Sequence, residues 1–343
     1  MRKRFLLALC CWFLVPGQSG FSQTNIFLPT NSSRVRALGM GGAVASIEDD
    51  LGAIAFNPAN YTLYRDPKGF RLTFFFSPLA PYLIAKNKQA FFDMPAAEEN
   101  ADWAAALSFI KAINVTINSF EFGIQTGEPR ILDLDAYRNN AQFLHLNSVY
   151  ANHFGSAVWR FRLAQQVSVG SSVHLLYWQT DTRRRRWAIA ASYGVTLQPQ
   201  PRIRFGVSLH TFPNDISHYR MNLEEIEDEA ISLGISYQAP WRMLLSFDVR
   251  NVGMGMEGPR EQYFGGVEQE LFGQIAFRGG VQYRPETNEF TYTAGIGLLN
   301  SNLFHGEAGQ FKNSNYVINY AVILKTINQE RLFIHAFSVL LRI

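Results

Sequence analysis

The chain has 343 residues, and its formal net charge of only +3 gives no electrostatic argument for a nucleic-acid partner. Aromatic residues make up 14% of the chain and charged residues 17%, which is less charge than the roughly 25% of an average soluble domain. Both cysteines, Cys10 and Cys11, lie within residues 1–22. A chain without these residues has no cysteine, which excludes disulfide frameworks, zinc–thiolate sites and cysteine nucleophiles.

The first 22 residues have the pattern of a secretory signal peptide. Basic residues 2–4 precede an apolar stretch at 5–15, and the small residues Gly20 and Ser22 precede a cleavage site before Gln23. The apolar stretch is too short for a membrane-spanning helix, which takes roughly 20 residues. We therefore expect removal of residues 1–22 and export across the inner membrane.

From about residue 69 onward, the chain alternates between apolar and polar or small residues. In the segment 202–211, Ile203, Phe205, Val207 and Leu209 share one face, because successive strand residues point to opposite sides. A soluble β-sandwich also alternates, but these segments have the length of tilted membrane strands rather than the five or six residues usual in globular sheets. The pattern predicts an all-β fold, a transmembrane antiparallel up-and-down barrel.

About fourteen strands are expected, an even number that returns both chain ends to the periplasmic side. The expected strands lie near 69–80, 103–113, 114–125, 148–162, 166–179, 187–197, 201–211, 230–239, 242–250, 261–270, 274–284, 288–299, 314–324 and 331–343. The second is ambiguous, because apolar residues within 95–113 also recur at helical spacing. This stretch is either a strand or a helix at the barrel mouth.

The stretch 36–59 reads RALGMGGAVASIEDDLGAIAFNPA. Its glycines do not follow a strand, so a phosphate-binding loop is a poor explanation. The stretch resembles the N-terminal signature of the FadL/TodX and PorV/PorQ outer-membrane superfamily, and the segments 264–298 and 318–343 resemble the same superfamily more loosely. The residues that carry the signature are Gly39, Gly41, Gly42, Asp49, Asp50, Asn57 and Pro58.

The resemblance implies a fourteen-stranded barrel in the outer membrane with an N-terminal hatch in its lumen. The expected division is a signal peptide at 1–22, a hatch at 23–66 and the barrel at 67–343. The short hatch signature and the compact size of the chain favour the PorV/PorQ branch. A protein of that type would act as an interaction barrel in type IX secretion, with secreted proteins or secretion components as partners. A FadL-like protein would instead take up hydrophobic compounds such as fatty acids passively.

Most charged residues of the polar strand face are expected in the lumen. The arginines there need acceptors, and Glu48, Glu268 and Glu270, with Asp49 and Asp50, are candidates. The set forms either a structural network that holds the hatch or a relay for anions. The predicted lumen-facing residues are Arg202, Arg204, His210, Arg242, Asp248, Arg250, Arg278 and Arg284.

An arginine run comprises Arg183, Arg184, Arg185 and Arg186. It is expected in a short external loop at 181–187. It is either a solvated loop tip or a contact for anionic groups such as lipopolysaccharide phosphates.

Catalytic and metal-binding motifs are lacking in the rest of the sequence. The histidines are scattered without metal-ligand spacing, and no Gly-x-Ser-x-Gly motif occurs. The sequence therefore predicts no enzyme, no metal and no cofactor. A lipase-like Ser–His pair on neighbouring strands is left open.

Overall fold

The computed structural model describes residues 23–27, 34–49, 51–63, 69–78, 81, 109–126, 154–181, 184–211, 229–252, 261–272, 275–298, 316–327 and 330–343. Strands dominate these residues, with three short helical turns near the N-terminus. The helical turns are α2 (Val35–Gly39), α3 (Ala53–Phe56) and the 3-10 helix η2 (Pro58–Asn60).

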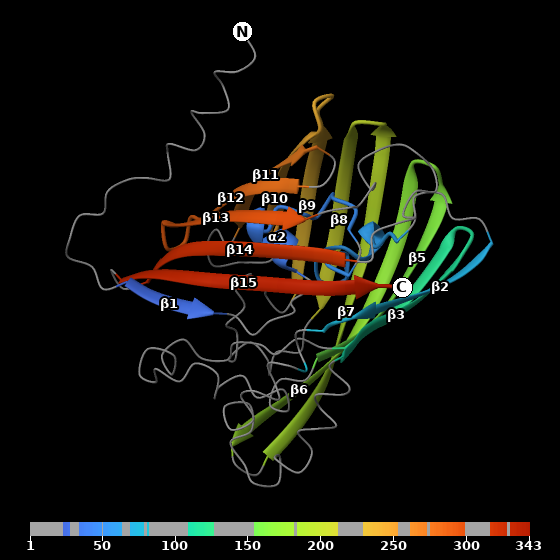
Figure 1. Cartoon of the computed structure of the whole chain (residues 1–343), viewed down its shortest axis with the longest axis horizontal. Coiled ribbons are helices and arrows are strands. Elements are labelled where there is room, and N and C mark those ends of the chain that lie inside the picture. The colour runs from blue at the N-terminus through green and yellow to red at the C-terminus, as the bar shows by residue number, and fades with distance from the viewer. Residues whose placement is uncertain are drawn as a thin grey trace.

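The strands β2 to β15 follow one another around a single antiparallel sheet, and β15 pairs with β2 to close it (Figure 1). The predicted fourteen-stranded up-and-down barrel is thereby confirmed. The strand bounds are β2 Phe70–Phe76, β3 Ile110–Ile117, β4 Phe120–Gln125, β5 Phe154–Ala164, β6 Val167–Asp181, β7 Arg184–Gln200, β8 Ile203–Thr211, β9 Glu229–Gln238, β10 Met243–Arg250, β11 Gln262–Leu271, β12 Ile275–Arg284, β13 Glu289–Leu298, β14 Tyr316–Ile327 and β15 Glu330–Arg342.

The closing seam is short. Leu341 lies opposite Phe76 and Arg342 opposite Phe75, and the backbones of Phe74 and Ile343 exchange hydrogen bonds of 2.8 and 3.0 Å. An additional strand that the sequence did not predict, β1 (Gln23–Phe27), pairs in parallel with the first half of β15.

The two faces of the barrel wall differ as the period of two requires. Outward residues are large, apolar and exposed: Ile189 is 68% exposed, Tyr193 52% and Phe247 47%. Inward residues on the same strands are buried and mostly polar or small, such as Ser192 and Asp248. A closed sheet with an apolar outer surface is the arrangement that a bilayer requires.

No helix in the part of the chain that the structure describes is long and apolar enough to cross a membrane.

One hairpin differs from its predicted position. The sequence predicts strands at 103–113 and 114–125, but β3 and β4 meet at a turn over Asn118 and Ser119. Asn118 adopts a left-handed backbone (φ 47°), which asparagine tolerates better than most residues, and its side chain accepts from Gly69 N at 3.0 Å. The helix interpretation is wrong for residues 110–113, which lie in β3, and residues 95–108 fall outside the described residues.

The predicted external loop at 181–187 is also wrong. β7 begins at Arg184, which lies opposite Asp181 of β6, so most of the arginine run belongs to a strand. The β6–β7 hairpin extends past the ends of its neighbours β5 and β8, as Figure 1 shows. Arg183 lies outside the described residues.

Candidate functional site

The residues 34–49 and 51–63, called the N-terminal segment below, lie against the inward face of the wall. The helix α2 packs on β12 to β15, and η2 packs on β5 to β7 (Figure 1). Almost every residue of the segment is buried, including Met40, Leu51 and Tyr61 at 0% exposure. The segment is therefore buried against the inward face of the wall.

The predicted glycine motif forms a tight turn after α2. Gly41 (φ 66°) and Gly42 (φ 86°) have left-handed backbones, and Gly42 N donates to Ala37 O at 2.8 Å. A Cβ on Gly41 would lie 2.8 Å from the backbone nitrogen of Val281 on β12. The turn needs glycine both for its backbone conformation and for its approach to the wall. Gly39, at the end of α2, packs against Gly295 of β13.

The wall carries matching glycines, called the glycine belt. A Cβ on Gly206 would lie 1.9 Å from Ala45 O, on Gly170 2.4 Å from Pro58 O, and on Gly280 2.2 Å from Gly41 N. Each atom that would be struck is backbone, so no side-chain rotation could relieve the overlap. The wall thus receives the backbone of the segment directly. The belt comprises Gly170, Gly194, Gly206, Gly234, Gly266, Gly280 and Gly295.

A buried ion network joins α2 to the wall. Arg36 forms two hydrogen bonds to the Glu268 carboxylate of β11, at 3.0 and 2.9 Å. The same carboxylate accepts from Arg278 Nε of β12 at 2.5 Å, and Arg36 also contacts Asp49 at 3.1 Å. Removal of one partner from such a network leaves an uncompensated buried charge.

A second network joins Glu48 of the segment to Arg204 of β8 at 3.0 Å and to Arg160 of β5 at 3.5 Å. Arg160 also pairs with Glu121 of β4 at 2.9 Å. Glu48 of the segment thus meets arginines of the wall, whereas Asp49 pairs with Arg36 of the segment itself. Asp50 lies outside the described residues.

The wall strand β10 holds the glycine turn through two charged side chains. Asp248 accepts a hydrogen bond from Ala45 N at 2.7 Å. Arg250 donates to Gly42 O, and its guanidinium lies 5.1 Å from the ring centre of Phe56 and 4.0 Å from that of Phe264. Charge and aromatic faces therefore hold the segment at the same point.

Asn57 and Pro58 end α3 and begin η2. Asn57 is extended (φ −152°), its side-chain oxygen accepts from Ala59 N at 3.0 Å, and its amide donates to Ala45 O at 2.7 Å. Pro58 stands in the first turn of η2, where its missing N–H costs nothing. The Asn-Pro pair thus ties two turns of the segment together.

Of the eight residues predicted to face the lumen, six are inward-facing wall residues: Arg204, His210, Asp248, Arg250, Arg278 and Arg284. Arg202 and Arg242 do not join them. Both lie in turns, where the alternation of the strand has ended, and both are exposed; the Arg242 side chain is 47% exposed and lies 3.7 Å from Glu270.

A row of serines and histidines crosses the wall from β5 to β8. His174 contacts Ser156 at 2.9 Å and Ser192 at 3.1 Å, and Ser192 contacts His210 at 2.9 Å. His210 also contacts Ser208 at 3.2 Å, so serine hydroxyls engage both ring nitrogens of this histidine. All five side chains are buried. A hydrolytic serine needs an accessible base–nucleophile pair, whereas this row is held under the segment.

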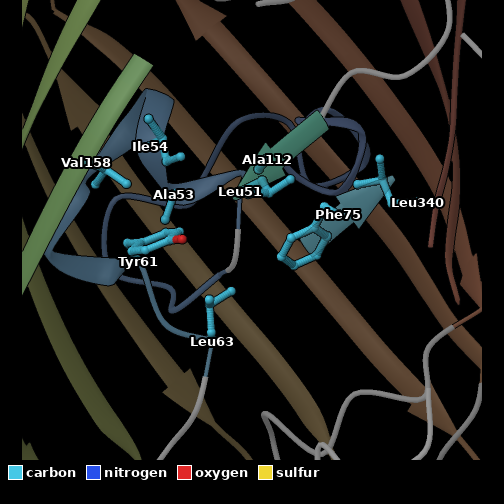
Figure 2. Close-up of a cluster of buried hydrophobic side chains, with 9 residues drawn as sticks. All are labelled: Leu51, Ala53, Ile54, Tyr61, Leu63, Phe75, Ala112, Val158 and Leu340. Carbon is cyan, nitrogen blue, oxygen red and sulfur yellow. The ribbon is translucent and has the colours of Figure 1, made fainter. Parts of the chain in front are cut away.

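The inward face is not polar all round. Phe75 of β2, Ala112 of β3, Val158 of β5 and Leu340 of β15 point into the lumen and form one buried cluster, called the apolar sector. Figure 2 shows these side chains packed against the segment. The segment contributes Leu51, Ala53, Ile54, Tyr61 and Leu63.

Among the described residues, no group of three or more His, Cys, Asp or Glu side chains could hold a metal ion.

No family model and no curated protein matches the chain. Among solved structures, the CymD monoaromatic hydrocarbon channel is similar with 12% identity and a TM-score of 0.47, over 92% of this chain and 96% of that one. The Pseudomonas putida toluene transporter TodX is similar with 11% identity and a TM-score of 0.45, over 93% of this chain and 98% of that one. A triple mutant of the Rhodopseudomonas blastica porin has 10% identity and a TM-score of 0.36, over 68% of this chain and 78% of that one. Identities of 12% or less and TM-scores of 0.47 or less assign no function to this chain.

Proposed function

We propose that the chain is an outer-membrane barrel through which hydrophobic small molecules cross the membrane. The observation that carries this proposal is the apolar sector on the inward face. An inward face that lines an aqueous pore is polar. Here a phenylalanine and a leucine on neighbouring strands, Phe75 and Leu340, point inward and are buried under apolar residues of the segment.

Such a surface favours hydrophobic cargo on energetic grounds. Each Å² of apolar surface that leaves water contributes about 25 cal/mol. The sector is already buried under the segment, so an apolar compound gains by burying its own surface where it takes the place of segment side chains. A sugar or an ion gains nothing there and loses hydration. Elsewhere the inward face also carries charged side chains that contact the N-terminal segment, among them Glu268, Asp248 and Arg250.

An uptake assay in whole cells tests the proposal, because an intact lipopolysaccharide layer slows hydrophobic compounds that would cross a simple bilayer unaided. Cells that produce the barrel and cells with an empty vector receive a labelled long-chain fatty acid, a labelled monoaromatic hydrocarbon and a labelled sugar. We expect faster entry of at least one hydrophobic compound and unchanged entry of the sugar. Equal entry of every compound into both kinds of cell would exclude the proposal.

The secretion-associated role that the sequence resemblance implies stays a prediction. It concerns the external end of the barrel. The connections 127–153 and 212–228, which the strand order leads us to expect there, are outside the described residues. Purification of the tagged barrel from its native membrane tests it. Stoichiometric recovery of secreted proteins with a shared C-terminal signal would support this role, and recovery of bound hydrophobic compounds alone would support transport.

A further inference from the structure

The N-terminal segment is held differently on its two sides. Toward β6 to β13, contact is made mainly by backbone. At the glycine belt an added Cβ would come within 1.9 to 3.1 Å of a segment atom, and that atom is backbone at five of the seven positions. Glu268 and Asp248, with the arginines beside them, add buried charge contacts on the same side. A displacement here would break several charge-assisted hydrogen bonds at once, which are stronger than hydrogen bonds between neutral groups.

Toward β2, β3 and β15, contact is made by apolar side chains. Leu51 packs with Phe75, Ala112 and Leu340 in one cluster, all at 3% exposure or less (Figure 2). Apolar packing has no directional bond to break, and a rotamer change is enough to move the atoms in contact. On this side, the side chains in contact can therefore rearrange while the backbone of the segment stays in place.

The apolar contact of the segment with β2, β3 and β15 has a definite boundary. Beyond Tyr61, the segment is again held by directed bonds: the Tyr61 hydroxyl contacts Asn114 Oδ1 of β3, and Leu63 N donates to Glu121 Oε1 of β4 at 3.1 Å. The compliant contact is therefore confined to the region around Leu51, between β3 and β15.

We infer that hydrophobic compounds pass between the N-terminal segment and the apolar sector, and that Phe75 sets the size of the compound that fits. The inference rests on the proposed function. Phe75 is the largest wall side chain of the sector and is 0% exposed. Its ring is thus the bulk that a compound has to displace on this route.

Phe75→Ala tests the inference, and Phe74→Ala is its matched control. Phe74 is the preceding residue of β2 and has the same side chain, but it faces outward, where its ring stacks on Phe76 at 6.1 Å. Uptake is measured for a series of hydrophobic compounds of increasing bulk. We expect Phe75→Ala to raise the uptake of the bulkiest compound severalfold relative to the smallest, because loss of a buried ring leaves a cavity. Phe74→Ala should keep the wild-type size profile.

The outcomes separate the inference from the proposed function. If the wild-type barrel takes up no hydrophobic compound, the proposed function fails. If the wild type transports and both variants keep its size profile, the inference fails while the function stands. Heat-modifiable migration on gels shows whether each variant is folded. If Phe75→Ala does not fold, Phe75→Leu replaces it, with Phe74→Leu as its control and a smaller shift toward bulky compounds as the expected result.

Discussion

Replacement of Gly280 by alanine tests whether the N-terminal segment packs on β12, and Gly279→Ala, at the neighbouring position, is the control. A Cβ on Gly280 would lie 2.2 Å from Gly41 N and 2.3 Å from Met40 C, so backbone has to move by about 1 Å to reach ordinary contact. A Cβ on Gly279, on the outward face, would meet Val267 Cγ1 at 3.6 Å, which is ordinary contact.

The expected magnitude follows from two opposing effects. Alanine in place of a strand glycine stabilises by about 0.5–1 kcal/mol, because the unfolded chain loses freedom. Overpacking against backbone costs about 1–3 kcal/mol. The first effect acts in both variants, so their difference isolates the second. We expect Gly280→Ala to have a free energy of unfolding about 1–3 kcal/mol below that of Gly279→Ala.

Urea unfolding in lipid vesicles, followed by tryptophan fluorescence, measures this difference. Trypsin supplies an independent measurement, because Arg36 is buried and hydrogen-bonded in the native barrel. Cleavage after Arg36 should be faster in Gly280→Ala than in Gly279→Ala. Equal unfolding free energies and equal cleavage in the two variants would show that the segment does not rest on β12 as described.

Two further predictions concern charge. Glu268→Gln should lower the free energy of unfolding by roughly 3–5 kcal/mol, because two buried arginines lose their shared acceptor. Glu270→Gln should cost less, because its partner Arg242 lies 3.7 Å away and has a half-exposed side chain that is solvated by water. Equal losses in urea unfolding would contradict the network. Serine at two positions of the run 184–186 should lower the lipopolysaccharide that purifies with the barrel, if this stretch contacts lipid phosphate. The control removes the same charge from the exposed turns, as Arg202→Ser with Arg242→Ser, and an equal effect of both pairs would reject a specific contact.

The strands could be predicted from the sequence because the alternation that marks them is local. In β8, for example, four apolar residues and the polar residues between them identify both faces without knowledge of any neighbour. Turn positions were harder. Asn118 interrupts the alternation over only two residues, so the sequence around it reads equally well as one long strand or as two strands with another boundary.

The contacts of the N-terminal segment with the wall could be predicted only in part. The arginines of the strand faces and the acids at 48–50 suggest that opposite charges meet, and Glu48 does meet Arg204. The role of Arg36 was not foreseen, because its partner Glu268 is 232 residues away and only the register of β11 brings them together. The Ser–His row was missed for the same reason: each contact joins different strands, and no local pattern encodes strand register.

The glycine belt also has a meaning for the reading of other barrel sequences. Each belt residue marks a place where the wall lacks a side chain and the enclosed segment approaches closely. In register pairs such as Gly170 with Gly194 and Gly266 with Gly280, two such places adjoin. Together, the belt glycines lie along the path of the enclosed segment across the wall. At five of the seven belt positions the nearest segment atom is main chain, so at these positions the segment's side chains can change wherever its own turns permit. In a related barrel, inward glycines on successive strands would therefore reveal the course of an internal segment even after the segment's own signature had been lost.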